Sequence, residues 1–201
     1  MTDVTFITGL LKSIITLFII VDPFASAAFF LGFAKNASKA ERNKAVLTAI
    51  SVAAVLMFVF LFSGLSILKV MNISFDGFKI AGGLILLVLG ATTVLGIDIG
   101  GSHRENMKSA AILIATPLLS GPGTLATLVV LSKDYGYIIP AIASLLILAV
   151  SYIILRFSFN IHNVVGTEVI DVLSKVLGLL LSALAVDYIY SGVVGLISGG
   201  L

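Results

Sequence analysis

The sequence predicts an all-helical membrane protein, with six transmembrane helices arranged as two inverted three-helix repeats. Hydrophobic residues form 59% of the 201 residues and charged residues 11%, whereas a soluble domain is about half apolar and a quarter charged. The mean hydropathy is +1.20. Six apolar segments follow one another, and motifs recur in the two halves. We therefore expect one transmembrane domain over 1–201, with repeat one at about 1–98 and repeat two at about 99–201.

Six apolar segments are separated by short polar links. A helix needs about 20 apolar residues to cross the hydrocarbon core, and each segment provides that length or more. The segments cover 6–34, 45–68, 78–97, 109–131, 137–157 and 170–197.

The first segment is interrupted by Asp22 and Pro23, with Phe24 after them. If Lys12 and Lys35 reach opposite membrane surfaces, a rise of about 1.5 Å per residue places this pair near the bilayer centre. Proline removes a helix donor but is tolerated at the first position of a new helix. The sequence thus predicts a half-helix that begins at Pro23 in mid-membrane, with Asp22 as its N-cap.

The second and third segments are uninterrupted. The third opens with Lys79-Ile80-Ala81-Gly82, and similar residues, Lys175-Val176-Leu177-Gly178, recur in the sixth. We interpret the two lysines as interfacial anchors. Small residues in spans allow close helix packing, which we expect at Gly82, Gly83, Gly90 and Gly178.

The fourth segment contains a second break, which consists of Ser120, Gly121, Pro122, Gly123 and Thr124. Its flanking lysines, Lys108 and Lys133, again place it near the centre. This break has no acidic residue, so the free amides and the positive dipole end of a new helix are available to an anion. The small residues are expected to let a ligand approach the backbone.

The fifth segment is a plain span, and the sixth carries Asp187 between apolar residues. A carboxylate inside a membrane is costly and usually functional. Asp187 is therefore a candidate group for ion or proton coupling; the alternative is a local pair with a lysine or hydroxyl.

Each half has three spans, so the second half must enter the membrane with the opposite topology, an arrangement typical of secondary transporters. Most lysines and arginines lie in three of the links: Lys35, Lys39, Arg42, Lys44, Arg104, Lys108 and Arg156. The positive-inside rule then predicts that these links are cytoplasmic and that both termini are external.

Several function classes find no support. A net charge of +2 gives no basis for nucleic-acid binding, and the absence of cysteine removes thiolate chemistry. His103 and His162 have no ligand partner at metal spacing. No nucleophile stands at a recognisable distance from a base, so we expect neither an enzyme nor a resident cofactor or metal.

The chain resembles the MarC family of integral membrane proteins over essentially its whole length. The resemblance is carried by Ala40-Glu41-Arg42-Asn43-Lys44, by Lys79-Ile80-Ala81-Gly82-Gly83-Leu84-Ile85, by Pro117 followed by Ser120-Gly121-Pro122-Gly123-Thr124, and by Asp22-Pro23, where the family has Asp-Pro or Asn-Pro. The family often continues with a glycine and a second proline, whereas Ala25, Ala27 and Ala28 stand here. The resemblance implies a six-span inverted-repeat protein of a prokaryotic plasma or inner membrane, in some members a glycine or alanine carrier.

Together these features predict a secondary transporter of small neutral amino acids that works by alternating access around the two breaks. The ligand is a small zwitterion, with its carboxylate at 120–124 and its ammonium group at Asp22. Coupling to protons would use Asp22 or Asp187, and coupling to sodium would use carbonyls freed before Pro23 and Pro122. A channel or facilitator and a non-transporting membrane scaffold are the alternatives. Lipid is an expected partner, and an oligomer is left open.

Overall fold

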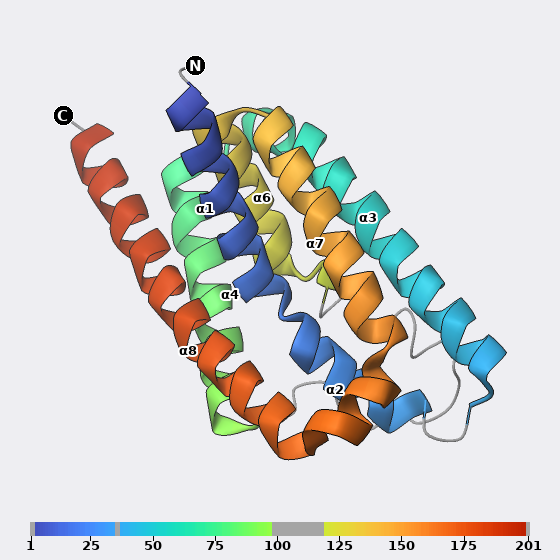
Figure 1. The fold of residues 1–201 in the computed structure, drawn as a ribbon. Helices are drawn as coiled ribbons and strands as arrows, with labels where there is room; N and C mark the ends of the chain where they lie inside the picture. The colour runs from blue at the N-terminus through green and yellow to red at the C-terminus, as the bar shows by residue number, and fades with distance from the viewer. Residues whose placement is uncertain (1–2, 35–36, 98–118, 200–201) are drawn as a thin grey trace.

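The computed structural model describes residues 3–34, 37–97 and 119–199. These residues form helices and contain no strand. The helices pack as a bundle of long, tilted rods, with both termini at the same end (Figure 1). They are α1 Asp3–Val21, α2 Pro23–Ala34, α3 Lys39–Val70, α4 Phe75–Leu95, α6 Pro122–Tyr135, α7 Ile138–Arg156 and α8 Ser158–Gly199.

Five stretches of the described chain are long and apolar enough to cross a membrane. They are Thr5–Gly32, Lys39–Val70, Phe75–Leu95, Ile138–Arg156 and Glu168–Ser198. They coincide with the first, second, third, fifth and sixth predicted spans, so the all-helical membrane fold is confirmed. Part of the fourth predicted span lies outside the described residues, and its described part, α6, has 14 residues. The six-span inverted repeat therefore stays a prediction.

Local sequence signals explain where the long helices begin. Ser38 and Glu41 form a capping box before α3: the Ser38 Oγ accepts the Glu41 N–H at 3.3 Å, and the Glu41 carboxylate accepts the Ser38 N–H at 2.9 Å. At the start of α4 the Ser74 Oγ accepts the N–H of Gly77 at 3.1 Å, without a reciprocal side-chain bond. Gly96, with φ 68°, ends α4 in the left-handed region that favours glycine.

The link between the fifth and sixth predicted spans is helical, because α8 begins at Ser158. Gly166 interrupts this helix with φ 81° and ψ 162°, a conformation that glycine adopts without steric cost. A short helical piece therefore precedes the apolar span Glu168–Ser198. The sequence contains Gly166, but a single glycine does not reveal that helix continues on both sides of it.

The predicted glycine packing is confirmed where α4 crosses α8. A Cβ added to Gly83 would lie 2.7 Å from Ile189 Cγ1 and 2.9 Å from the Ala185 carbonyl oxygen. A Cβ on Gly178 would lie 2.9 Å from Thr93 Cβ. No real side chain tolerates such separations, so these glycines set the close approach of the two backbones.

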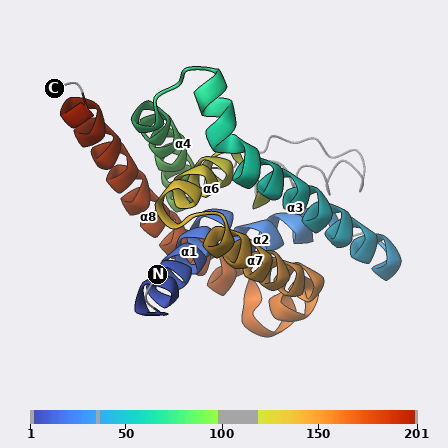
Figure 2. The same ribbon diagram turned by 90° about the horizontal axis from the view of Figure 1, so that it is seen from above.

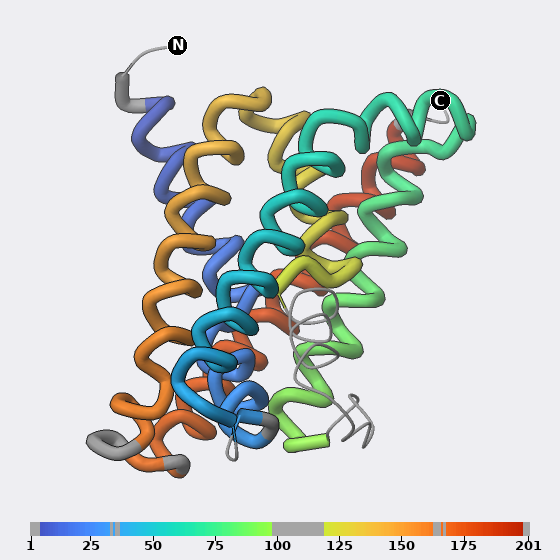
Figure 3. Tube along the Cα trace, turned by 90° about the vertical axis from the view of Figure 1, so that its right-hand side faces the viewer, coloured from blue at the N-terminus to red at the C-terminus, as the bar shows by residue number. Residues whose placement is uncertain are grey.

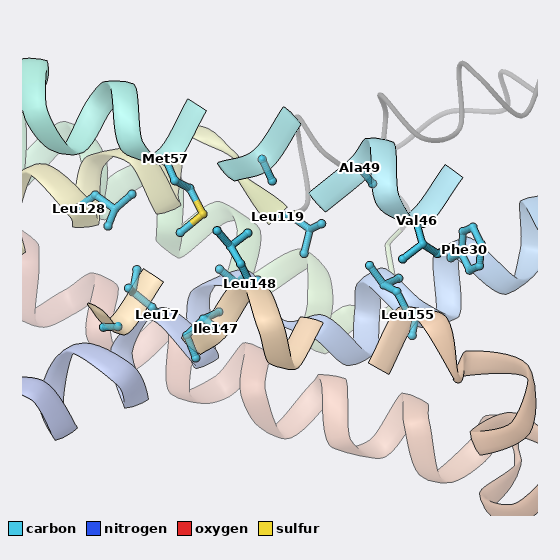
Figure 4. Packing of buried hydrophobic residues seen from close by; sticks show 14 of the residues in the cluster. Leu17, Phe30, Val46, Ala49, Met57, Leu119, Leu128, Ile147, Leu148 and Leu155 are labelled. Atoms are coloured by element: carbon cyan, nitrogen blue, oxygen red, sulfur yellow. The ribbon is translucent and has the colours of Figure 1, made fainter. Parts of the chain in front are cut away.

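The short helix α6 lies in the centre of the bundle, among α1, α3, α4 and α7 (Figure 2). The main hydrophobic core packs around it, and the fully buried residues Leu17, Met57, Leu128 and Ile147 bring α1, α3, α6 and α7 together (Figure 4). Most side chains of α6 are buried. The start of α6 is therefore held inside the protein.

Candidate functional site: two helix starts at mid-height

Two helices begin at the same level, halfway along the bundle. The helices α1 and α2 meet at Asp22, and α6 starts beside this junction at Pro122 (Figures 1 and 3). From this level α2 runs away from the end that holds the termini, whereas α6 runs toward it. The N-terminal ends of two oppositely directed helices thus meet in the interior.

Asp22 both ends α1 and starts α2. Its N–H donates to the Phe18 carbonyl at 3.2 Å, and its φ of 37° is left-handed, as in a helix C-terminal cap. Its Oδ1 accepts the N–H of Ala25 at 3.0 Å, and its carbonyl accepts the N–H of Ser26 at 3.1 Å. The predicted capping role is confirmed. Aspartate is one of the few residues that tolerate this backbone conformation.

The junction leaves hydrogen-bond acceptors unused at the end of α1. Pro23 has no N–H to offer the carbonyl of Ile19, four residues earlier. The N–H of Ala25 binds the Asp22 carboxylate instead of the Val21 carbonyl. These carbonyls form the negative end of the α1 dipole, beside a carboxylate that is only 9% exposed. This half of the site is suited to a cation.

The start of α6 has the opposite character. Gly121 is its N-cap and provides no side-chain hydrogen bond. The first backbone bond of the helix runs from the Leu125 N–H to the Gly121 carbonyl at 3.0 Å. The amides of Gly123 and Thr124 precede this bond, and both residues are buried. This half of the site is suited to an anion.

The space left by the missing side chain of Gly123 is filled by a neighbouring helix, whereas the sequence suggested that it would admit a ligand. A Cβ added there would collide with Leu86 Cδ2 of α4. The missing side chain therefore allows α6 to pack against α4. The carbonyl and amide groups of the turn remain the parts of this break that a ligand can use.

One further polar group beside the Asp22 junction was not found by sequence reasoning. Ser26, one turn after Asp22 on α2, is 0% exposed, and its hydroxyl has no hydrogen-bond partner. A buried unsatisfied hydroxyl costs about 1–3 kcal/mol. The signal in the sequence is its spacing of four residues from the cap, which places it on the same face of the helix.

The other predicted site residues are divided between the interior and the surface. Pro23 and Ser120 are buried, Phe24 is half-buried edge-on to Phe18, and Pro122 is exposed. Asp187 lies on an exposed part of α8, so it is not among the buried residues around the two helix starts. Within the described part of the chain, Lys175 and Asp171 form an ion pair at 2.7 Å, and Asp187 takes no part in it. The described ranges place no three His, Cys, Asp or Glu side chains so as to hold a metal ion.

Comparison with known proteins places the sequence of this chain in a family. The chain is 31% identical over 191 residues to a UPF0056 membrane protein of Methanocaldococcus jannaschii, which covers 90% of this chain and 93% of the relative. It is 30% identical to the UPF0056 inner membrane protein MarC of Citrobacter koseri, covering 92% and 93% of the two chains. It is 27% identical to the UPF0056 membrane protein YhcE of Escherichia coli, covering 94% and 93%. No solved structure matches the chain.

The family model described as MarC family integral membrane protein matches residues 7–197, which include both helix starts and nearly all of the five apolar spans of the described chain. The chain belongs to the MarC family of integral membrane proteins.

Proposed function

We propose that this protein is a secondary transporter of small neutral amino acids, with its substrate held between Asp22 and the start of α6. The observation that carries the proposal is the meeting, at one level, of two helix starts of opposite electrostatic character. Transporter sites commonly lie on interrupted helices near the bilayer midplane. A zwitterion has one charged group for each half of such a site.

The carboxylate of the substrate binds the amides of Gly123 and Thr124, where the α6 dipole is positive. Its ammonium group binds the Asp22 carboxylate and the carbonyls of Ile19 and Val21. Ser26 supplies a hydroxyl on the Asp22 side. Leu86 closes the space beside Gly123, which favours substrates with small side chains such as glycine and alanine.

Alternating access moves one half of the bundle against the other around this fixed site. The single-residue junction at Asp22 is a natural point for such movement, because its backbone hydrogen bonds join Asp22 to Phe18 of α1 on one side and to Ser26 of α2 on the other. Protons or sodium ions supply the driving force in this scheme. A proton binds the Asp22 carboxylate, whereas sodium takes the carbonyls at the end of α1.

Counterflow in proteoliposomes tests the proposal. A carrier preloaded with unlabelled alanine accelerates the entry of labelled alanine, whereas a simple pore does not. Acceleration that falls in Asp22→Ala and persists in Asp171→Asn, a matched exposed carboxylate, supports the site. Uptake without counterflow supports a channel, since opposed helix ends also suit a selective pore. No flux of any small solute supports a scaffold and contradicts the proposal.

A further inference from the structure

Two lysines meet at one aromatic ring near the end of the bundle that holds the termini. The Lys133 Nζ, from the last turn of α6, lies 4.0 Å from the centre of the Phe75 ring. The Lys79 Nζ of α4 lies 5.1 Å from the same centre. Lys79 also donates to the Ser191 Oγ of α8 at 3.0 Å. Three helices thus place two ammonium groups, one hydroxyl and one ring together.

Within the described residues neither ammonium group lies within ion-pair distance of a carboxylate. The acidic residues that lie near them along the chain are Asp76, one turn before Lys79, and Asp134, directly after Lys133. The face of the Phe75 ring attracts each cation weakly but cannot cancel their mutual repulsion. Lys79 is half-buried, so its charge is also partly removed from water. In addition to the interfacial position expected from the sequence, the side chain of Lys79 reaches across to Ser191 on a neighbouring helix.

The position of this group connects it to the site at mid-height. Lys133 is at one end of α6, and the uncapped amides are at the other, about 15 Å away at 1.5 Å per residue. Between them Tyr188 of α8 reaches toward Thr127 of α6. The helices α1, α3, α4 and α7 surround α6 (Figure 2), and Lys133 in its last turn is exposed, so a dissolved anion can reach this end of the helix.

We propose that Lys79, Lys133, Phe75 and Ser191 form a docking site for a carboxylate, which receives the small amino acid at one end of α6 before it moves to the start of that helix. The two ammonium groups hold the carboxylate, Ser191 orients Lys79, and the Phe75 ring contacts the aliphatic part. The identity of the solute rests on the proposed transport function. The phosphate of an anionic lipid shares the required chemistry, and the experiment separates the two.

The test measures lysine acylation rates, by mass spectrometry, in the full chain in phosphatidylcholine nanodiscs, where both faces are accessible. Acetate is the probe and acetamide its neutral control. Acetate should slow acylation of Lys79 and Lys133 by about twofold at a concentration equal to its Kd, and more above it. The internal control is Lys69, which is exposed in the last turn of α3. Its acylation rate should not change. In Lys133→Gln the protection of Lys79 should weaken. Equal protection of Lys69, or no protection by acetate, overturns the proposal.

Two further experiments distinguish a solute from a lipid headgroup as the ligand, and the docking site from the transport function. If phosphatidylglycerol nanodiscs protect both lysines without added solute, the site binds a lipid headgroup, and the assignment to a solute is wrong. Lys79→Gln should raise the KM for alanine counterflow severalfold and leave kcat within about twofold, since docking precedes the transport step. Acetate protection without counterflow retains the anion site and removes the transporter function. Counterflow without acetate protection removes the docking site alone.

Discussion

The two helix starts at mid-height use the same residue in the same position and produce opposite surroundings. Each places a proline at the first position of a new helix. At Pro23 the preceding residue is an aspartate, which takes the amide of Ala25 for itself. At Pro122 the preceding residue is a glycine, which takes none. The two helix starts therefore differ in the residue before the proline: one carries a carboxylate and the other has no side chain.

The two starts also differ in how the chain reaches them. The helix α1 continues to Asp22, which turns directly into α2 with a left-handed φ of 37°. Gly121, in contrast, has φ −63° and ψ 169°, an extended conformation that any residue can adopt. Substitutions at Asp22 therefore test backbone and charge together, whereas those at Gly121 test the helix end alone.

The largest effect is expected for Asp22→Ala. It removes the cap, worth about 1 kcal/mol, and forces alanine into the left-handed region at a further cost of about 1–2 kcal/mol. Alanine counterflow should be abolished and the thermal midpoint lowered. Asp22→Gly restores backbone freedom, so it should recover part of the stability and none of the counterflow. Equal stability of the two variants would contradict the backbone account.

A smaller effect is expected when the second start is made to resemble the first. In Gly121→Asp the new carboxylate occupies the N-cap position and competes for the free amides. Alanine affinity should fall by more than about tenfold, which corresponds to the loss of a charge-assisted bond worth about 1.5–3 kcal/mol. Gly121→Ser should have a weaker effect of the same sign. Unchanged affinity in Gly121→Asp would place the carboxylate elsewhere.

Gly123→Ala should destabilise the fold through packing. The added methyl group collides with Leu86, and such overpacking costs about 1–3 kcal/mol. Shortening the neighbour in Gly123→Ala/Leu86→Val should restore part of the thermal midpoint. The matched control is Gly32→Ala, where an added Cβ meets nothing within 4 Å. If the double variant is no more stable than the single one, the contact with Leu86 is not the cause.

Ser26→Ala should give the smallest effect. Without ligand, the free energy of unfolding should stay level or rise by up to about 1 kcal/mol, because an unsatisfied buried hydroxyl is removed. Alanine affinity should fall by about threefold to tenfold if this hydroxyl binds the substrate. Ser151→Ala on α7 removes an equally buried, unpartnered hydroxyl and should leave affinity unchanged. Calorimetric titration of both variants distinguishes these results.

Sequence reasoning was strongest where chemistry is local. The Asp22 cap and the helix start at Pro122 follow from neighbouring residues, and the glycine packing of α4 against α8 follows from residue size. It failed where a side chain meets a partner far along the chain. Ser191 is 112 residues from Lys79, and Leu86 faces Gly123 from another helix. A single sequence gives the period of a helix but not which neighbour each face meets.

The most direct test of the central claim measures which end of the ligand each helix start binds. Wild type and Asp22→Asn, which keeps a capping oxygen, are titrated with alanine and with propionate, which lacks the ammonium group. Asp22→Asn should weaken alanine binding about tenfold, since an uncharged acceptor binds an ammonium group less strongly, and leave propionate binding within about twofold. Alanine affinity that is unchanged in Asp22→Asn, or propionate affinity that falls equally, would contradict a zwitterion bound between the two helix starts.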